Sequence, residues 1–368
     1  GSPTATNPIL LGGSAANFNL GQWGGSTLTL SGNIDFGVAA SRTITVNALS
    51  GSSNNAQALS GAIYGAGTLN KQGVGLLQLS GANAGSLNLT GANAVTVSNG
   101  TLQLVDSDKS LGIAPATPTS SIAVDGSILS LNSTSEFIMS PNRGVSLGGT
   151  NSFGVIDVNV TASTYTARFA SVLSGQGLIK TGTLLLLPAA NTYAGNTIIT
   201  TDRLQAQNSL ALGSSAGGTI VYPAGQLELF NGISGGSLNI SAEPLTLQGL
   251  GFSSYGALSN KGGSNVFGGP ITLDNPITGA QINSDSGLLT LSGAIDSTNN
   301  TNLILSGTGG AGLLLISGQI GSGVTTLTKQ NSGTAILAGA NAYTGLTTIS
   351  AGALRLRNDS ALGATTQG

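Results

Sequence analysis

Hydrophobic and polar residues alternate along most of this chain. The pattern is clear in stretches such as Ser26–Gly32, Arg42–Asn47, Leu76–Gly81, Gly100–Val105 and Thr325–Lys329. Because alternate side chains of a β-strand face opposite sides, it predicts short strands with Leu, Ile and Val inward and Thr, Ser, Asn or Gln outward. Turn dipeptides such as SG, GG, NG and GA end these stretches, and none has the 3.6-residue period of an amphipathic helix. We therefore predict an all-β protein with almost no helix.

Two distant segments have nearly the same sequence. Asn191–Gly213 and Asn341–Gly363 align without a gap, and ten of their 23 positions are identical. The apolar alternation is preserved, as at Ile199 and Ile349, while most other residues differ. A repeat that keeps its glycines and its alternation in this way preserves a backbone shape.

A lysine-containing element recurs before each of three Leu-Gly pairs. It reads TLNKQGVGLLQLSGANA at Thr68–Ala84, LIKTGTLLLLPAANTY at Leu178–Tyr193 and TLTKQNSGTAILAGANAY at Thr326–Tyr343. We divide the chain into N-terminal coils or a cap at 1–64, repeat units at 65–112, 113–213 and 214–363, and a tail at 364–368. The first repeat unit carries an insertion, Gly85–Ala94.

A stack of coils explains these repeats better than a β-sandwich. A sandwich has a fixed set of strands, whereas a solenoid adds coils of roughly 20–30 residues and takes insertions in its loops. With 58 Gly and only 4% aromatic residues, the chain suits a core of small and medium aliphatic side chains. Roughly 15–18 coils about 4.8 Å apart would form a rod roughly 70–90 Å long. We predict a parallel β-helix, or β-solenoid, that forms one elongated rod.

The composition excludes several classes of function. Only 7% of residues are charged and the net charge is −2, so no basic stripe is available for nucleic acid. An apolar content of 39% argues against disorder, and no apolar run is long enough for a membrane-spanning helix. The start lacks the features of a signal peptide, so we expect an export signal outside this sequence. A chain without Cys, with a polar but uncharged surface, is typical of an exported bacterial protein.

Catalytic groups are scarce. The chain has no His, which removes the Ser-His-Asp triad and most zinc sites. The nearest carboxylate grouping, Asp106-Ser107-Asp108-Lys109, is expected to be a solvated loop. Asp274, Asp285 and Asp296 are spaced eleven apart at turn-like positions and form a weak alternative site. We predict no catalytic residue, no metal and no cofactor; the rival hypothesis is a polysaccharide-degrading or polysaccharide-binding β-helix.

Recurrent lysines and tyrosines receive structural interpretations. Lys71, Lys180 and Lys329 are expected to shield a coil edge or to meet solvent. Tyr193 and Tyr343 are expected to cap the core. Five aromatic residues are the candidate surface for a carbohydrate or another partner, with packing as the alternative: Tyr222, Phe230, Phe252, Tyr255 and Phe267.

The repeat resembles a known family. The pattern K-x-G-x-G-x-L-x-L-x-G-A-N-x-Y-x-G-x-T-x-I, followed by G-x-L-x-L and A-L-G, is carried by Lys329–Gly363 and Lys180–Gly213, and less regularly by Lys71–Gly112. It is similar to the passenger-associated strand repeat of bacterial autotransporters. Two connecting segments, Asn142–Val160 and Ala242–Leu273, also read like this family, and the resemblance covers most of the chain from about Thr68.

The resemblance implies a right-handed parallel β-helix that is exported and displayed on a Gram-negative cell surface. We expect the outer-membrane translocator barrel to lie outside this fragment. The implied role is a stalk or adhesive scaffold, with the chain itself, host or matrix surface molecules, or glycans as partners. The repeat is fairly specific for the family and much less specific for any activity.

Overall fold

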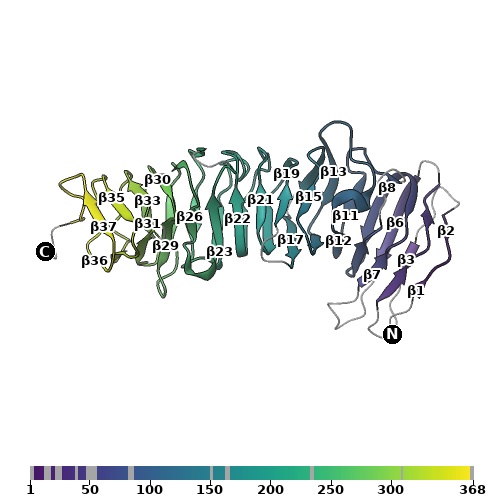
Figure 1. Ribbon diagram of the computed structural model, residues 1–368, viewed down its shortest axis with the longest axis horizontal. Helices are drawn as coiled ribbons and strands as arrows, with labels where there is room; N and C mark the ends of the chain where they lie inside the picture. Colours follow the sequence, from purple (N-terminus) through teal and green to yellow (C-terminus); the bar gives the residue numbers. More distant parts are fainter. Residues whose placement is uncertain are drawn as a thin grey trace. The chain divides into compact units, whose positions relative to one another are not determined.

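Short parallel strands make up nearly all of the structure, a computed structural model (Figure 1). It describes residues 4–11, 18–20, 27–37, 40–46, 56–81, 87–149, 152–161, 166–232, 236–307 and 310–364. The chain divides into two compact units, Gly1–Thr183 (unit 1) and Leu184–Gly368 (unit 2). Each unit is a β-solenoid in which strands of successive coils pair in parallel, so the predicted all-β solenoid is confirmed. The predicted repeat boundaries remain predictions, and the division at Thr183/Leu184 falls inside the predicted unit 113–213.

Two long ladders of paired strands form unit 1. The first ladder contains β1 (Thr4–Ala5), β4 (Leu28–Leu30), β7 (Ala56–Leu59), β9 (Leu76–Leu79), β12 (Thr101–Val105), β14 (Ile128–Ser133), β17 (Gly154–Val160) and β20 (Leu178–Gly182). The second contains β3 (Phe18–Leu20), β6 (Ala40–Val46), β8 (Ile63–Gln72), β11 (Val95–Val97), β13 (Thr119–Val124), β16 (Arg143–Leu147) and β19 (Leu173–Gly175).

Shorter pairings complete unit 1. They involve β2 (Ile9–Leu10), which pairs with β5 (Ile34–Asp35); β10 (Leu87–Asn88), which, like β5, pairs with β8; and β15 (Phe137–Met139), which pairs with β18 (Ala167–Phe169). A 3-10 turn, η1 (Asp108–Leu111), follows β12.

Three ladders form unit 2, and each is named after one residue in it. The Ile199 ladder contains the first parts of β22 (Thr197–Ala206) and β23 (Thr219–Leu229), then β25 (Leu245–Leu247), β28 (Ile271–Leu273) and β31 (Ile295–Ser297). The Leu204 ladder contains β21 (Leu185–Leu187), the second parts of β22 and β23, β26 (Leu258–Asn260), β29 (Ala280–Ser284), β32 (Leu303–Ser306), β34 (Leu327–Lys329) and β36 (Thr347–Ile349). The Phe267 ladder contains β24 (Asn239–Ile240), β27 (Ser264–Phe267), β30 (Gly287–Leu291), β33 (Gly312–Ile316), β35 (Thr334–Leu337) and β37 (Ala353–Leu356).

The register stacks like side chains on like. In unit 1, one row of side chains is stacked from coil to coil and fully buried: Leu77, Leu102, Leu129 and Ile156. One position further along, Gln78, Gln103, Ser130 and Asp157 form the neighbouring row. Burial of the aliphatic row drives the stacking of coils, because each buried side chain contributes roughly 1.5–3 kcal/mol relative to an exposed one.

The polar row is hydrogen-bonded along its length. Gln78 Nε2 donates to Gln103 Oε1 at 3.0 Å, and Gln103 Nε2 donates to Ser130 Oγ at 3.3 Å. Ser130 Oγ in turn donates to an Asp157 oxygen at 3.3 Å. Uncharged side chains can pair in this way when coils place them one above another, whereas like charges would repel. The low charge of the sequence therefore has a structural reason.

Coils differ in length because extra residues lie in the loops between strands and not in the strands themselves. Lys329 pairs with Ile349 across a short coil, whereas Leu227 pairs with Leu258 across a longer one. The longer coil contains the loop of η2 (Phe252–Ser254), a 3-10 turn in unit 2. Among the described residues, no helix is long and apolar enough to cross a membrane.

The two copies of the repeat, Asn191–Gly213 and Asn341–Gly363, do not occupy equivalent faces. Ile199 of the first copy pairs with Val221 in the Ile199 ladder. Its counterpart Ile349 pairs with Lys329 at the end of the Leu204 ladder. The separation of the copies is thus not a whole number of coils, and the second copy is rotated by one face about the axis of unit 2.

Candidate functional site

The recurrent lysines lie inside the solenoid, not at a solvated edge. Lys71 and Lys180 are fully buried and Lys329 is 1% exposed, so the prediction that they shield an edge or meet solvent is wrong. Lys71 Nζ donates to the carbonyl oxygens of Gln72, Gly73 and Asn99 at 3.0, 2.6 and 2.9 Å. An ammonium group has three donors and no acceptor, and here all three reach carbonyls.

The same arrangement occurs in unit 2. Lys329 Nζ donates to the carbonyl oxygens of Gln330, Asn331 and Ala351, the last of them in the following coil. Asn331 has a φ of 61°, and Gly73 in the corresponding turn of unit 1 has a φ of 76°. This left-handed turn directs successive carbonyls toward the lysine, and Gly and Asn are the residues that adopt it most readily.

Burial shifts the titration of these lysines. It lowers the pKa of Lys71 to about 8 and lowers the pKa of Lys329 in the same direction, because desolvation disfavours the charged form. The converging carbonyls oppose this effect, because they hydrogen-bond the charged form. Because backbone carbonyls of two successive coils surround the ammonium groups of Lys71 and Lys329, these lysines link one coil to the next.

A recurrent Asn at the start of each repeat copy is hydrogen-bonded to the Ala-Leu-Gly ending of the same copy. Asn191 Nδ2 donates to the Ala211 carbonyl, and Asn341 Nδ2 donates to the Ala361 carbonyl, both at 2.6 Å. This bond explains why Asn recurs at the start of both copies and why the ending is kept with it.

A recurrent Tyr bonds to a recurrent Thr in the same way. The buried Tyr343 hydroxyl bonds to Thr347 Oγ1 at 2.8 Å, and Tyr193 makes the corresponding contact with Thr197 Oγ1 in the first copy. Tyr193 and Tyr343 are both fully buried and therefore belong to the core, as expected; that they cap it stays a prediction.

Asp108 belongs to a buried ion pair. The solvated loop predicted at Asp106–Lys109 is wrong for this residue, which is only 6% exposed. Arg143 Nε donates to Asp108 Oδ2 at 3.1 Å, and the guanidinium also reaches the carbonyls of Leu89, Gly112 and Ile113. Arg143 and Asp108 lie far apart in the sequence, so only the coil register brings them together.

Each of the three spaced carboxylates has its own partners. Asp274 accepts from Gln248 Nε2 at 3.0 Å, Asp285 pairs with Lys261 at 2.7 Å, and Asp296 accepts from the Gly323 amide at 2.9 Å. Within the described ranges, no group of three or more His, Cys, Asp or Glu could hold a metal ion.

The five candidate aromatic residues do not form one surface. Tyr222 and Tyr255 are 42% and 50% exposed, and Phe252 is half-buried. Phe230 is also half-buried but lies beside Gly262, at the other end of β23. Phe267 is completely buried in the core and therefore cannot contribute to a surface.

A bulge lies at Tyr222 and Pro223, and Pro223 contacts the segment that leads into the η2 loop. In the β22–β23 pairing the register shifts between Ile199 and Thr201, so that Tyr222 and Pro223 stand opposite one residue. Pro223 packs against Gly249, where an added Cβ would lie 3.0 Å from Pro223 Cα. Gln226 Nε2 donates to the Tyr255 carbonyl at 3.3 Å and so links β23 to the same loop.

Arg203 on β22 joins this neighbourhood. Its guanidinium carbon lies 5.4 Å from the centroid of the Phe252 ring, within the range of a cation–π contact. Arg203 also pairs with Asp202 at 3.1 Å and with the buried Glu228 at 3.8 Å. We call Tyr222, Phe252, Tyr255 and Arg203 the aromatic neighbourhood.

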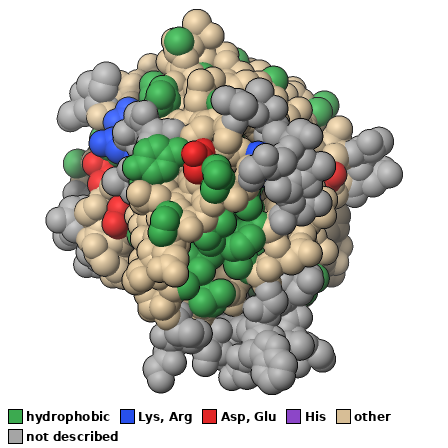
Figure 2. Space-filling view, turned by 90° about the vertical axis from the view of Figure 1, so that its right-hand side faces the viewer, with side chains coloured by type: hydrophobic (Ala, Val, Ile, Leu, Met, Phe, Trp, Pro, Cys, Tyr) green, Lys and Arg blue, Asp and Glu red, His purple; other side chains and the backbone are tan. Residues whose placement is uncertain are grey.

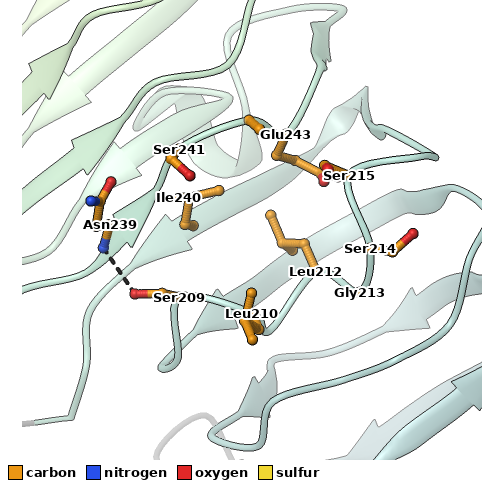
Figure 3. A pocket seen from close by; sticks show the side chains of 11 residues that line it. Ser209, Leu210, Leu212, Gly213, Ser214, Ser215, Asn239, Ile240, Ser241 and Glu243 are labelled. Atoms are coloured by element: carbon orange, nitrogen blue, oxygen red, sulfur yellow. Dashed lines mark hydrogen bonds between the residues drawn. The ribbon is translucent and has the colours of Figure 1, made fainter.

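A separate cavity of about 280 Å³ lies beside the first repeat copy (Figure 3). Two segments form its wall, the loop after β22 and the end of β24 with the residues that follow. The lining residues are Ser209, Leu210, Leu212, Gly213, Ser214, Ser215, Asn239, Ile240, Ser241, Ala242 and Glu243. Sequence reasoning missed this site, because its two segments are joined only by the coil register.

Glu243 is the one ionisable side chain in this lining. It is 4% exposed, and its Oε1 accepts from Thr219 Oγ1 at 2.8 Å. Burial raises its pKa to about 7, although the Thr219 hydrogen bond favours the charged form. A rare acidic residue just before Pro244 was the available sequence signal.

We expect Glu243 to make unit 2 more stable in mild acid. Between its ordinary pKa of 4.5 and the folded value of about 7, the folded chain binds more protons than the unfolded one, so stability falls as pH rises. After a discount for solvent screening at the cavity, the effect should be about 1–2 kcal/mol. Urea unfolding at pH 5 and pH 7.5 measures it.

Matched variants identify the group responsible. Glu243→Gln should remove most of the difference between the two pH values, and Glu136→Gln, at an exposed position, should leave it unchanged. A residual slope of the same sign is expected from Glu228, because burial raises its pKa too. An undiminished difference in Glu243→Gln would contradict the assignment.

Comparison with known proteins finds similarity to autotransporters in parts of the chain. The passenger-associated-transport-repeat matches residues 327–356, which contain Lys329 and the start of the last repeat copy. The adhesin BmaC autotransporter of Brucella suis biovar 1 (strain 1330) is 32% identical over 106 residues, which are 28% of this chain and 3% of that protein. The chain therefore corresponds to a small part of its curated relative. No solved structure matches.

Proposed function

We propose that this chain is a segment of an autotransporter passenger and serves as an adhesive scaffold on the surface of a Gram-negative cell; the matched repeat and the similarity to an autotransporter adhesin support this. The aromatic neighbourhood is the observation that supports contact with a partner through the lateral surface of the solenoid. Tyr and Arg are enriched where proteins meet partners, because they combine a large apolar surface with hydrogen-bonding groups. They stand out here because the rest of the chain is so poor in aromatic and charged residues.

The chain as a whole is poor in charged residues, which make up only 7% of it. On another face, seen in Figure 2, polar side chains and backbone predominate among the described residues, charged groups are few, and hydrophobic side chains gather near the middle. A surface of this kind is well suited to hydroxyl-rich partners, because it offers many hydrogen-bonding groups without the desolvation cost of charges. We propose that glycans on host or matrix surfaces stack on the exposed tyrosines.

Loss of the two tyrosines tests this proposal. The double variant Tyr222→Ala and Tyr255→Ala should reduce binding of the purified chain to glycan-bearing cells about tenfold or more, since a loss of about 1.4 kcal/mol is already tenfold and one hot-spot aromatic contributes about 2 kcal/mol. Tyr64→Ala is the matched control, because Tyr64 is 41% exposed in unit 1 and outside the neighbourhood. Equal binding by all three proteins would overturn the proposal.

Two further measurements separate this role from its rivals. Screening polysaccharides with the purified chain tests for catalysis. Robust turnover that is lost on Asp→Asn or Glu→Gln substitution would show that the chain is an enzyme and would overturn the scaffold proposal. Sedimentation velocity over a concentration series tests whether the partner is a second copy. Reversible dimers would favour cell–cell contact through the scaffold itself.

A further inference from the structure

The cavity beside Glu243 has the dimensions of a site for one small ring. Its volume of about 280 Å³ lies just below the range of about 300–1,000 Å³ for ligand pockets. Such a volume accommodates a single sugar residue better than a polymer chain. Its wall combines apolar side chains, including Leu212 and Ile240, with the hydroxyls of several serines.

The carboxyl group of Glu243 lacks a cation. No Lys or Arg occurs among the cavity residues, and Glu243 takes part in none of the ion pairs found in the described part of the chain. Its one hydrogen bond among those residues is the bond that Oε1 accepts from Thr219. Burying a carboxylate without a partner charge is costly, so a ligand that supplies the charge would gain by entering.

The serines leave donors for ligand hydroxyls. Ser209 Oγ already accepts from the Asn239 amide at 2.9 Å, as the dashed line in Figure 3 shows, and Ser214 Oγ accepts from the Ala216 amide at 3.3 Å. Each of these hydroxyls can also donate its hydrogen to a ligand oxygen, because a hydroxyl is both donor and acceptor. In Figure 3, Leu212 and Ile240 extend between the two polar sides and offer a wall for the C–H face of a ring.

We propose that this cavity binds one amino-sugar residue. The ammonium group of the ligand pairs with Glu243, its hydroxyls bond to Ser209 and Ser214, and its ring packs on Leu212 and Ile240. This inference goes beyond the adhesive scaffold and does not rest on the aromatic neighbourhood, so either can fail without the other.

Titration of the whole chain with three small probes tests the proposal. Glucosamine and glucose differ at one position, where the ammonium of the first replaces a hydroxyl of the second, and Nα-acetyl-lysine amide supplies an ammonium without a ring. At pH 7, nuclear magnetic resonance should show saturable shifts of the cavity residues with glucosamine. We expect at least tenfold weaker binding of glucose and of the lysine derivative.

The variant Glu243→Gln should reduce glucosamine binding to the level of glucose, while Glu136→Gln should bind like the wild type. A urea midpoint for Glu243→Gln that is close to the wild-type value at pH 5, and at least as high as it at pH 7.5, shows that the fold is retained. Absence of saturation up to about 50 mM glucosamine would overturn the site, since a weaker ligand would gain less than about 2 kcal/mol by binding. Equal affinity for glucose, or for the lysine derivative, would overturn its amino-sugar specificity.

Discussion

Replacing Arg143 by Met should destabilise unit 1 by about 3–5 kcal/mol, the largest effect we expect for a single substitution in this chain. The guanidinium is fully buried and pairs with Asp108 at 3.1 Å. Its removal leaves a buried carboxylate without a charge partner and three backbone carbonyls, those of Leu89, Gly112 and Ile113, without their donor. Met restores much of the volume but none of these bonds.

Urea unfolding followed by circular dichroism measures the loss, and amide hydrogen exchange localises it to the coils around η1. Arg168→Met is the control, since Arg168 is exposed on β18 and should change stability by less than about 0.5 kcal/mol. Adding Asp108→Asn to Arg143→Met should recover part of the loss, because the unpaired charge is then gone. Equal effects at Arg143 and Arg168 would show that the ion pair contributes nothing.

Replacing Lys71 by Met should cost about 2–4 kcal/mol in the same unit. The ammonium donates to two carbonyls of its own turn and to one in the next coil, so three hydrogen bonds to a charged donor are lost together. Unlike an ion pair between two side chains, this arrangement cannot be replaced by apolar packing, because the backbone carbonyls remain.

Lys109→Met provides the comparison, because Lys109 is exposed in η1. It should leave the urea midpoint nearly unchanged. Hydrogen exchange should show the Lys71→Met effect at the amides of β8, β9 and β11, which surround the turn. A variant as stable as the wild type would mean that water satisfies these carbonyls equally well.

Local sequence was sufficient to predict the strands and the architecture. Alternation of aliphatic and polar residues, as at Leu76–Gly81, is a property of neighbours in the chain, and it survives folding because a strand has a strict two-residue period. The stacking of near-copies follows from the same pattern. The burial of Tyr193 and Tyr343 was also predictable, since both recur within a repeat that preserves its shape.

The lysines show where this reasoning fails. At the sequence level a Lys in a glycine-rich turn is expected to meet solvent, because burying a charge is costly. The cost is offset at Lys71 and Lys329 by turn carbonyls and by one carbonyl of the following coil in each case. Those acceptors are backbone carbonyls, which every residue has, so the sequence does not show where they converge.

By itself, the sequence determined that this protein is a stack of short strands with an apolar inside, a hydrogen-bonding uncharged outside and a repeat with Asn, Tyr and Lys at fixed places. Only the tertiary structure decided which residues share a coil face. It paired Asp108 with Arg143, rotated the second repeat copy by one face relative to the first, and brought Glu243 to the serines after β22. The physical reason is that coils differ in length, as the pairings of Lys329 with Ile349 and of Leu227 with Leu258 show, so lateral neighbours depend on the accumulated register and not on any local pattern.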